Sequence, residues 1–152
     1  MCFMNDDLKY LPEEFLNRMN NMLGDDFQAF LNSYQQPRTF GIRVNTAKIS
    51  CEEFEKIVPF PISPIPWIPG GYFYPENVRP SKCAFYQAGL YYLQEPSAMT
   101  PVSRLLPKSG EYILDMCAAP GGKATALGAA LKGHGLLVAN DISTSRARAL
   151  LR

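Results

Sequence analysis

Residues 111–141 read EYILDMCAAPGGKATALGAALKGHGLLVAND, and this stretch decides the fold. The apolar run 112–116 predicts a short buried strand, and a loop rich in glycine follows it. An alanine-rich helix is expected over 123–132, and a second apolar strand over 136–140. Strand, helix and strand within about thirty residues indicate a βαβ unit, whose two strands are parallel. The chain is therefore expected to contain the start of an α/β, Rossmann-like sheet.

The loop after the first strand has the composition of a ligand-binding turn. In doubly wound sheets, ligands bind beyond the carboxyl ends of the strands. Gly121 and Gly122 allow the backbone to approach a ligand closely, and the next helix offers free N–H groups to a carboxylate or another anion. Asp141 lies twenty residues after Gly121, a spacing that suits an acid binding both hydroxyls of an adenosine ribose. Loop and acid together predict an adenosine-containing ligand.

Other ligands fit this loop less well. A P-loop needs G-x-x-x-x-G-K-[ST], but Cys117 replaces its first glycine and Ala124 replaces its Ser or Thr. The dinucleotide fingerprint G-x-G-x-x-G fails because Ala118 and Ala119 occupy the turn. A tight turn that binds nothing remains the structural alternative.

The N-terminal part, residues 1–58, predicts a small α+β domain with possible RNA contact. Apolar residues recur at helical spacing between Pro12 and Gly24, two residues suited to the beginning and end of a helix. A second helix is expected over 27–34. Alternation of apolar and polar residues over 40–45 predicts a half-buried strand.

Composition changes at residue 59. Five prolines fall between Pro59 and Pro69, which disfavours long helices and central strands there. We expect residues 59–108 to form a crossover rich in proline and aromatic residues, ending in a helix over 96–106. Residues 109–152 would then hold the first βαβ unit of an incomplete domain.

Bulk composition excludes several classes of protein. The 152 residues carry a formal net charge of +1, which favours no particular partner. Four cysteines show no C-x-x-C spacing and there is a single histidine, so no metal site is expected. No signal peptide or membrane span is recognisable, and a cytoplasmic protein is expected.

Three motifs together resemble a known family. Residues 115–123, QEPSAM at 94–99 and VAND at 138–141 closely resemble the Sun/NSUN family of RNA cytosine-C5 methyltransferases. Residues 11–23 and 38–45 resemble its bacterial branch, which modifies small-subunit ribosomal RNA. The resemblance implies a class I methyltransferase fold that binds S-adenosylmethionine, with residues 94–99 lining the approach to the cofactor and the target base. The binding residues that it implies are Cys117, Ala118, Ala119, Pro120, Gly121, Gly122, Lys123 and Asp141.

The resemblance also implies a covalent mechanism for the family. A cysteine thiolate adds to carbon-6 of cytosine, which makes carbon-5 nucleophilic toward the methyl group. The family carries its two cysteines in Pro-Cys and Thr-Cys motifs, and this sequence has neither. Its cysteines are Cys2, Cys51, Cys83 and Cys117, the last at a binding position, so no catalytic residue is assigned.

These observations lead to an expected function with alternatives. The sequence ends within an expected helix over 143–152, and we expect the N-terminal part of a longer rRNA methyltransferase that is inactive alone. Arg38, Arg43, Arg79 and Lys82 are candidates for RNA phosphate contacts, with nearby aromatic residues stacking on bases. The alternatives are methylation of another substrate, and a truncated S-adenosylmethionine-binding or RNA-binding module without catalysis.

Overall fold

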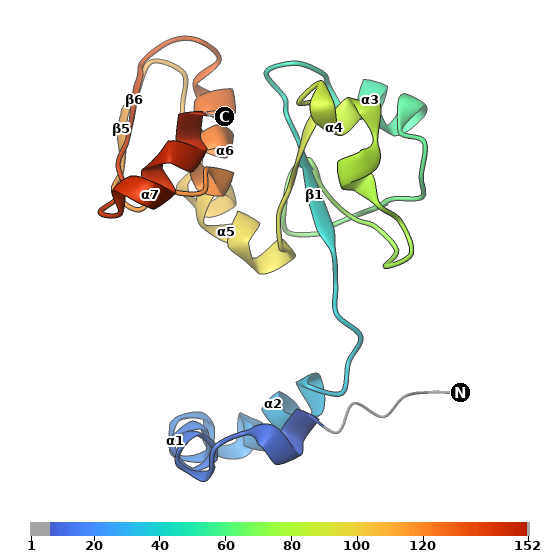
Figure 1. The fold of residues 1–152 in the computed structure, drawn as a ribbon, viewed down its shortest axis with the longest axis vertical. Helices are drawn as coiled ribbons and strands as arrows, with labels where there is room; N and C mark the ends of the chain where they lie inside the picture. Colours follow the sequence, from blue (N-terminus) through green and yellow to red (C-terminus); the bar gives the residue numbers. More distant parts are fainter. Residues whose placement is uncertain (1–6, 152) are drawn as a thin grey trace. The chain divides into compact units, whose positions relative to one another are not determined.

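The structure, a computed structural model, describes residues 7–151 and divides into two compact units at residues 38 and 39 (Figure 1). Helix α1 (Glu13–Leu23) begins after Pro12 and ends at Gly24, whose φ of 53° suits glycine, as the sequence predicted. Helix α2 (Phe27–Ser33) follows. No residue of either helix is buried, and a contact between the rings of Phe15 and Phe30 joins them. This first unit is a small pair of helices.

An antiparallel sheet forms the first part of the second unit. Its strand order is β2-β3-β1-β4, and β1 (Gly41–Val44) lies between β3 (Gly71–Phe73) and β4 (Tyr91–Leu93). The two-residue strand β2 (Ser63–Pro64) lies at the edge, where a proline is tolerated. The proline-rich stretch thus supplies no central strand.

Two helices accompany this sheet. Helix α3 (Cys51–Ile57) begins with a capping box, in which the Ser50 hydroxyl accepts from the Glu53 N–H and the Glu53 carboxylate accepts from the Ser50 N–H. Helix α4 (Ala84–Gln87) precedes β4. The core between sheet and helices contains the buried side chains Ile42, Val44, Phe54, Tyr72 and Tyr91.

Strand β1 is buried on both faces, so the prediction of a half-buried strand was wrong. Ile42 and Val44 face the aromatic core, whereas Gly41 and Arg43 point to the other side. There helix α5 (Pro96–Leu105) packs so closely that a Cβ on Gly41 would come within 2.9 Å of the Met99 methyl carbon. A helix from later in the chain therefore covers the face that the alternating pattern assigned to solvent.

The predicted βαβ unit is present. Strands β5 (Tyr112–Asp115) and β6 (Leu136–Ala139) are parallel, with Tyr112 opposite Leu136 and Asp115 opposite Ala139. Helix α6 (Gly122–Leu131) connects them and packs beside both strands (Figure 1). The structure confirms an α/β architecture whose sheet begins at this unit.

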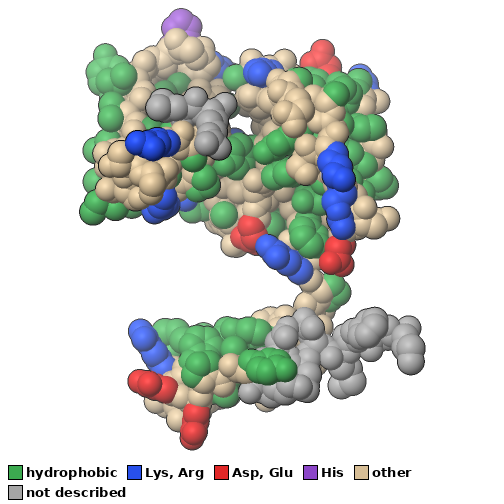
Figure 2. All heavy atoms as spheres, in the orientation of Figure 1, with side chains coloured by type: hydrophobic (Ala, Val, Ile, Leu, Met, Phe, Trp, Pro, Cys, Tyr) green, Lys and Arg blue, Asp and Glu red, His purple; other side chains and the backbone are tan. Residues whose placement is uncertain are grey.

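The first of these strands is buried on one face only, whereas the sequence predicted a buried strand. Ile113 is half-buried, but Tyr112 and Leu114 are 83% and 60% exposed. Leu136 and Val138 of β6 are exposed beside them. Figure 2 shows hydrophobic side chains along the edge where Figure 1 draws the two strands. Helix α6 covers the opposite face.

Short elements complete the described chain. Helix α7 (Thr144–Ala147) follows β6, and the 3-10 helices are η1 (Asp7–Tyr10), η2 (Gly24–Asp26), η3 (Pro80–Lys82) and η4 (Arg148–Leu151). Of the three segments expected from the sequence, 1–58, 59–108 and 109–152, the first two both contribute strands to the antiparallel sheet. Those domain boundaries stay a prediction.

Candidate ligand-binding site

The loop between β5 and α6 needs both of its glycines. Gly121 has a φ of 118°, a conformation that side chains disfavour, and it caps the N-terminus of α6. Gly122 has ordinary backbone angles, but a Cβ there would lie 2.9 Å from Nε2 of Gln94. The first glycine is required by its backbone conformation and the second by a neighbouring side chain.

Hydrogen bonds tie this loop to the end of β6. The Ala118 N–H donates to the Asn140 carbonyl, and the Gly121 N–H donates to the Ala118 carbonyl, both at 2.8 Å. Ala118 and Ala119 are buried, while Cys117 and Pro120 are exposed. Lys123 is half-buried in the first turn of α6. The predicted loop residues thus form one turn at the carboxyl edge of the parallel strands.

Asp141 lies against this loop. Its Oδ2 accepts from the Ala119 N–H at 3.2 Å, and its Oδ1 accepts from the Ser143 N–H at 3.0 Å. The Arg146 guanidinium lies 3.5 Å from Oδ2 and donates to the Ala119 carbonyl at 2.8 Å. With these neighbours the Asp141 side chain is only 2% exposed. Sequence reasoning missed Arg146, because nothing in its local pattern indicates a contact with the loop.

Asp115 carries an acceptor that lacks a partner. Its Oδ1 accepts from the Cys117 N–H at 3.1 Å, whereas Oδ2 is buried and receives no hydrogen bond from the described residues. Buried polar atoms are nearly always hydrogen-bonded in folded proteins. The sequence placed Asp115 in the loop motif but not among the binding residues. Its unpaired oxygen suits a donor from a ligand.

Arg43 reaches the same loop from the antiparallel sheet. Its Nη2 donates to the Gly122 carbonyl at 2.9 Å and to the Thr125 hydroxyl at 2.8 Å, and its Nε donates to Gln94 Oε1 at 3.2 Å. Its guanidinium carbon lies 5.8 Å from the centre of the Tyr92 ring. Because the residue is only 9% exposed, its expected contact with RNA phosphate was wrong.

Burial also affects the charge of Arg43. Loss of hydration lowers its pKa from the usual value for arginine to about 10, and Tyr92 opposes this shift. The guanidinium therefore remains charged at neutral pH. Since the pKa is lower in the folded state, the charged form opposes folding below pH 10, and this opposition fades as the pH rises above 10.

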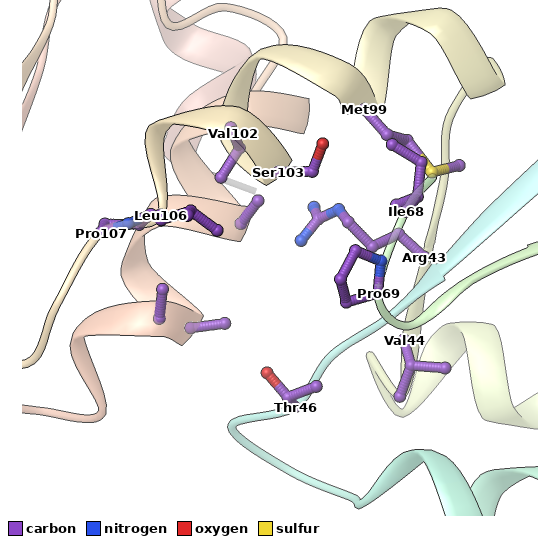
Figure 3. A pocket seen from close by; sticks show the side chains of 13 residues that line it. Arg43, Val44, Thr46, Ile68, Pro69, Met99, Val102, Ser103, Leu106 and Pro107 are labelled. Carbon is purple, nitrogen blue, oxygen red and sulfur yellow. The ribbon is translucent and has the colours of Figure 1, made fainter. Parts of the chain in front are cut away.

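A pocket of about 230 Å³ lies beside Arg43, between β1, α5 and α6 (Figure 3). The guanidinium points from β1 toward the helices, with Ser103 nearby. The remaining lining is mostly apolar and includes Val102, Leu106 and Ala129.

Among the other residues expected to contact RNA, some side chains are exposed and others are buried. Arg79 and Lys82 are exposed, and the Arg79 guanidinium donates to the Glu76 carbonyl. Tyr91 belongs to the core and donates to the Pro80 carbonyl at 2.8 Å, so it presents no face for base stacking. Trp67 is 44% exposed and packs edge-on against Phe73.

Two further expectations concern metals and membranes. Within residues 7–151, no three His, Cys, Asp or Glu side chains are grouped so that they could hold a metal ion. None of the helices in that range is both long and apolar enough to cross a membrane.

Solved structures of methyltransferases share this fold. A methyltransferase homolog protein from Pyrococcus horikoshii gives a TM-score of 0.83 at 29% identity, over 97% of this chain and 50% of that chain. NSun6 from Pyrococcus horikoshii gives 0.77 at 19% identity, over 92% and 61% of the two chains, and shows the fold alone. The fold is that of the Sun-type methyltransferases.

Sequence comparison identifies the family. Residues 11–96 match the family model of the N-terminal domain of 16S rRNA methyltransferase RsmF, and residues 102–152 match that of 16S rRNA methyltransferase RsmB/F. The first match covers more than half of the chain. The chain belongs to the RsmF family of 16S rRNA methyltransferases, which confirms the resemblance found in the sequence.

Individual relatives agree with this assignment. Ribosomal RNA small subunit methyltransferase F of Vibrio parahaemolyticus is 38% identical over 151 residues, covering 93% of this chain and 32% of the relative. The protein of the same name from Vibrio cholerae is 41% identical over 152 residues, covering 92% and 32%. The chain thus spans about a third of the length of the curated relatives that it matches.

Proposed function

We propose that this chain forms the S-adenosylmethionine-binding part of a methyltransferase that modifies cytosine-C5 in small-subunit ribosomal RNA. The observation that carries the proposal is the unpaired Oδ2 of Asp115, buried beside a glycine turn that opens a helix. A ligand with an ammonium group would supply the missing donor. Family membership and the name of the relatives support the choice of ligand and of RNA.

The residues present fit the three polar parts of this ligand. Asp115 Oδ2 would accept from the ammonium group of the methionine part. The free N–H groups at the start of α6 suit its carboxylate, with Lys123 in the first turn. Asp141 would accept from the ribose hydroxyls, once the exposed Arg146 guanidinium leaves Oδ2. The proposed binding set is therefore the predicted residues Cys117–Lys123 and Asp141, with Asp115 added.

The bound cofactor would supply a methyl group on a positively charged sulfonium. The chain contributes binding and orientation: two carboxylates, Asp115 and Asp141, lie at the ends of adjacent parallel strands and complement a cation. Neither a Pro-Cys nor a Thr-Cys pair occurs in the 152 residues. We infer that these residues bind the cofactor without transferring its methyl group to RNA.

The charge distribution favours RNA contact by the second unit over contact by the first. Residues 1–38 contain three Lys or Arg against six Asp or Glu, which gives −3, and residues 39–152 contain twelve against eight, which gives +4. Because RNA binding depends on cations that contact phosphates, the second unit is favoured. Exposed Arg79 and Lys82 belong to it.

Calorimetric titration of the chain with S-adenosylmethionine tests the proposal. We expect saturable binding that Asp115→Asn weakens about tenfold or more, because the amide lacks the charge that pairs with an ammonium group. Asp25→Asn makes the same chemical change at an exposed position of the first unit and should leave the affinity unchanged. A folded chain that releases no heat with this ligand would contradict the proposal.

Incubation with S-adenosylmethionine labelled in its methyl group, together with 16S rRNA, tests the inference that these residues do not transfer the methyl group. We expect no label on the RNA. Labelled cytosine would show that residues 1–152 methylate RNA without the family's cysteine motifs.

A further inference from the structure

We infer that Arg43 is a positioning residue, through which the antiparallel sheet sets the geometry of the cofactor loop. The inference rests on the proposed function for its link to cofactor affinity. Its structural basis is independent, because it consists of contacts between β1, β4 and the first turn of α6. The donors lie in the segment matched by the N-terminal family model, and the acceptors Gly122 and Thr125 in the segment matched by the other.

The contacts fall on the part of the loop that a ligand would use. Arg43 Nη2 binds the Gly122 carbonyl and the Thr125 hydroxyl. That hydroxyl donates in turn to the Gly121 carbonyl at 2.8 Å. One guanidinium therefore fixes Gly122 and Thr125, both in the first turn of α6. Sideways motion of the helix start would break both bonds from Arg43 together.

Gln94 and Tyr92 hold the guanidinium in place. Gln94 accepts from Arg43 Nε and donates from Nε2 to the Ala98 carbonyl at 3.0 Å, so its amide orientation is fixed from both ends. The same amide lies against Gly122, where a Cβ would collide with it. Tyr92 lies beneath the guanidinium and its hydroxyl donates to the Pro120 carbonyl at 3.5 Å. Arg43, Tyr92 and Gln94 thus contact successive parts of the loop.

The chemistry of Arg43 suits positioning better than general stabilisation. None of the described carboxylates forms an ion pair with it, so its burial is not offset by an opposite charge. Burial of a charge without such a partner opposes folding, and an apolar side chain of similar length removes that cost. The planar fork of arginine reaches acceptors in different directions, which a lysine cannot reproduce.

Four variants separate the roles. Arg43→Met keeps the apolar stem, Arg43→Lys keeps the charge, and Thr125→Val removes one acceptor. Arg104→Met is the matched control, since Arg104 is an exposed arginine of α5. Each chain is first compared with the wild type by circular dichroism and thermal unfolding. The readouts are then calorimetric affinity for S-adenosylmethionine and hydrogen–deuterium exchange of residues 118–127.

We expect Arg43→Met to retain its fold, to lose about tenfold in affinity and to accelerate exchange over 118–127 by a similar factor. Exchange over α3 should stay as in the wild type. Arg43→Lys should lose less affinity than Arg43→Met but still bind more weakly than the wild type. Arg104→Met should bind as tightly as the wild type. In a double-mutant cycle, Thr125→Val should add little to Arg43→Met, because both changes break the same contact.

The outcomes distinguish this inference from the proposed function. A wild-type chain that binds no S-adenosylmethionine, with faster loop exchange in Arg43→Met, would overturn the proposed function and support the positioning role. A wild-type chain that binds, with unchanged affinity and exchange in Arg43→Met, would overturn the positioning role alone. Equal losses in Arg43→Met and Arg104→Met would overturn it as well.

Discussion

The carboxylate of Asp141 accepts a hydrogen bond from the backbone N–H of Ala119, 22 residues earlier in the chain. Asp141, two residues after the end of β6, therefore holds the loop that leaves β5. The same carboxylate accepts from the Ser143 N–H and lies beside Arg146. An acid that the sequence assigned to ligand binding also maintains the shape of the site.

Replacing Asp141 should therefore affect stability as well as binding. Asp141→Asn removes the charge that attracts Arg146 and halves the number of acceptor oxygens. We expect a loss of about 1–2 kcal/mol in the free energy of unfolding, since a buried hydrogen bond to a charged group is broken. Urea unfolding followed by circular dichroism measures it, with Asp25→Asn as the exposed control. Equal unfolding midpoints for Asp141→Asn and the wild type would show that these bonds contribute nothing.

Replacement by alanine should raise stability at one glycine of α6 and weaken ligand binding at another. Gly128 lies inside the helix, where a Cβ would sit 3.7 Å from Leu137, an ordinary contact. Gly128→Ala should raise stability by about 0.5–1 kcal/mol, because glycine is a poor helix former. Gly122→Ala should displace the Gln94 amide and weaken S-adenosylmethionine binding. Thermal unfolding and titration of both variants test this difference, and a destabilised Gly128→Ala would contradict it.

Three tyrosines should make the fold sensitive to alkali. Burial raises the pKa of Tyr72, Tyr91 and Tyr92 above the usual value of about 10, and the Glu55 carboxylate adds to the rise at Tyr72. The folded state thus binds these protons more tightly, so the stabilisation is complete below pH 10 and declines as the pH rises further. We expect tyrosinate absorbance to appear at higher pH in the folded chain than in the unfolded chain. Tyr72→Phe should remove part of the absorbance that appears at high pH. A titration curve identical to that of the urea-unfolded chain would disprove the rise in the tyrosine pKa values.

The outer face of β5 and β6 should promote self-association. Tyr112, Leu114 and Val138 are exposed on adjacent strands, and contiguous apolar patches favour association. Leu114→Lys should lower the apparent mass in sedimentation at high concentration, with little change in unfolding temperature. Ile113→Lys places the same charge on the half-buried face against α6 and should destabilise the fold. Unchanged sedimentation for Leu114→Lys would rule out this face as the contact.

Local patterns predicted those parts of the fold that depend on neighbours in sequence. The βαβ unit, α1 between Pro12 and Gly24, and the absence of a central strand in the proline-rich stretch all follow from spacing and backbone preference. The loop and its place at the strand ends were predicted for the same reason. Their role in binding stays a prediction.

What the sequence failed to predict are contacts between segments that lie far apart in the chain. The pattern of β1 suggested one solvent face, but α5 covers it and buries Arg43. The hydrogen bond from Arg146 to the Ala119 carbonyl joins residues 27 positions apart, and the lack of a partner for Asp115 Oδ2 likewise depends on how segments meet. Residue type alone gives no measure of such proximity. An arginine on a strand looks the same in sequence whether it contacts a phosphate or a carbonyl.

The Arg43–Gly122 bond joins residues 79 positions apart, and this separation has a consequence for synthesis and folding. During translation Arg43 is synthesised well before its acceptors, and the entropic cost of closing this segment grows only slowly with its length. Strand β1 pairs with β3 and β4, which also precede α6 in the chain, so these strands can pair before the acceptors are synthesised. The turn that opens α6 therefore gains its contacts with the antiparallel sheet only after residues 122–125 have been synthesised.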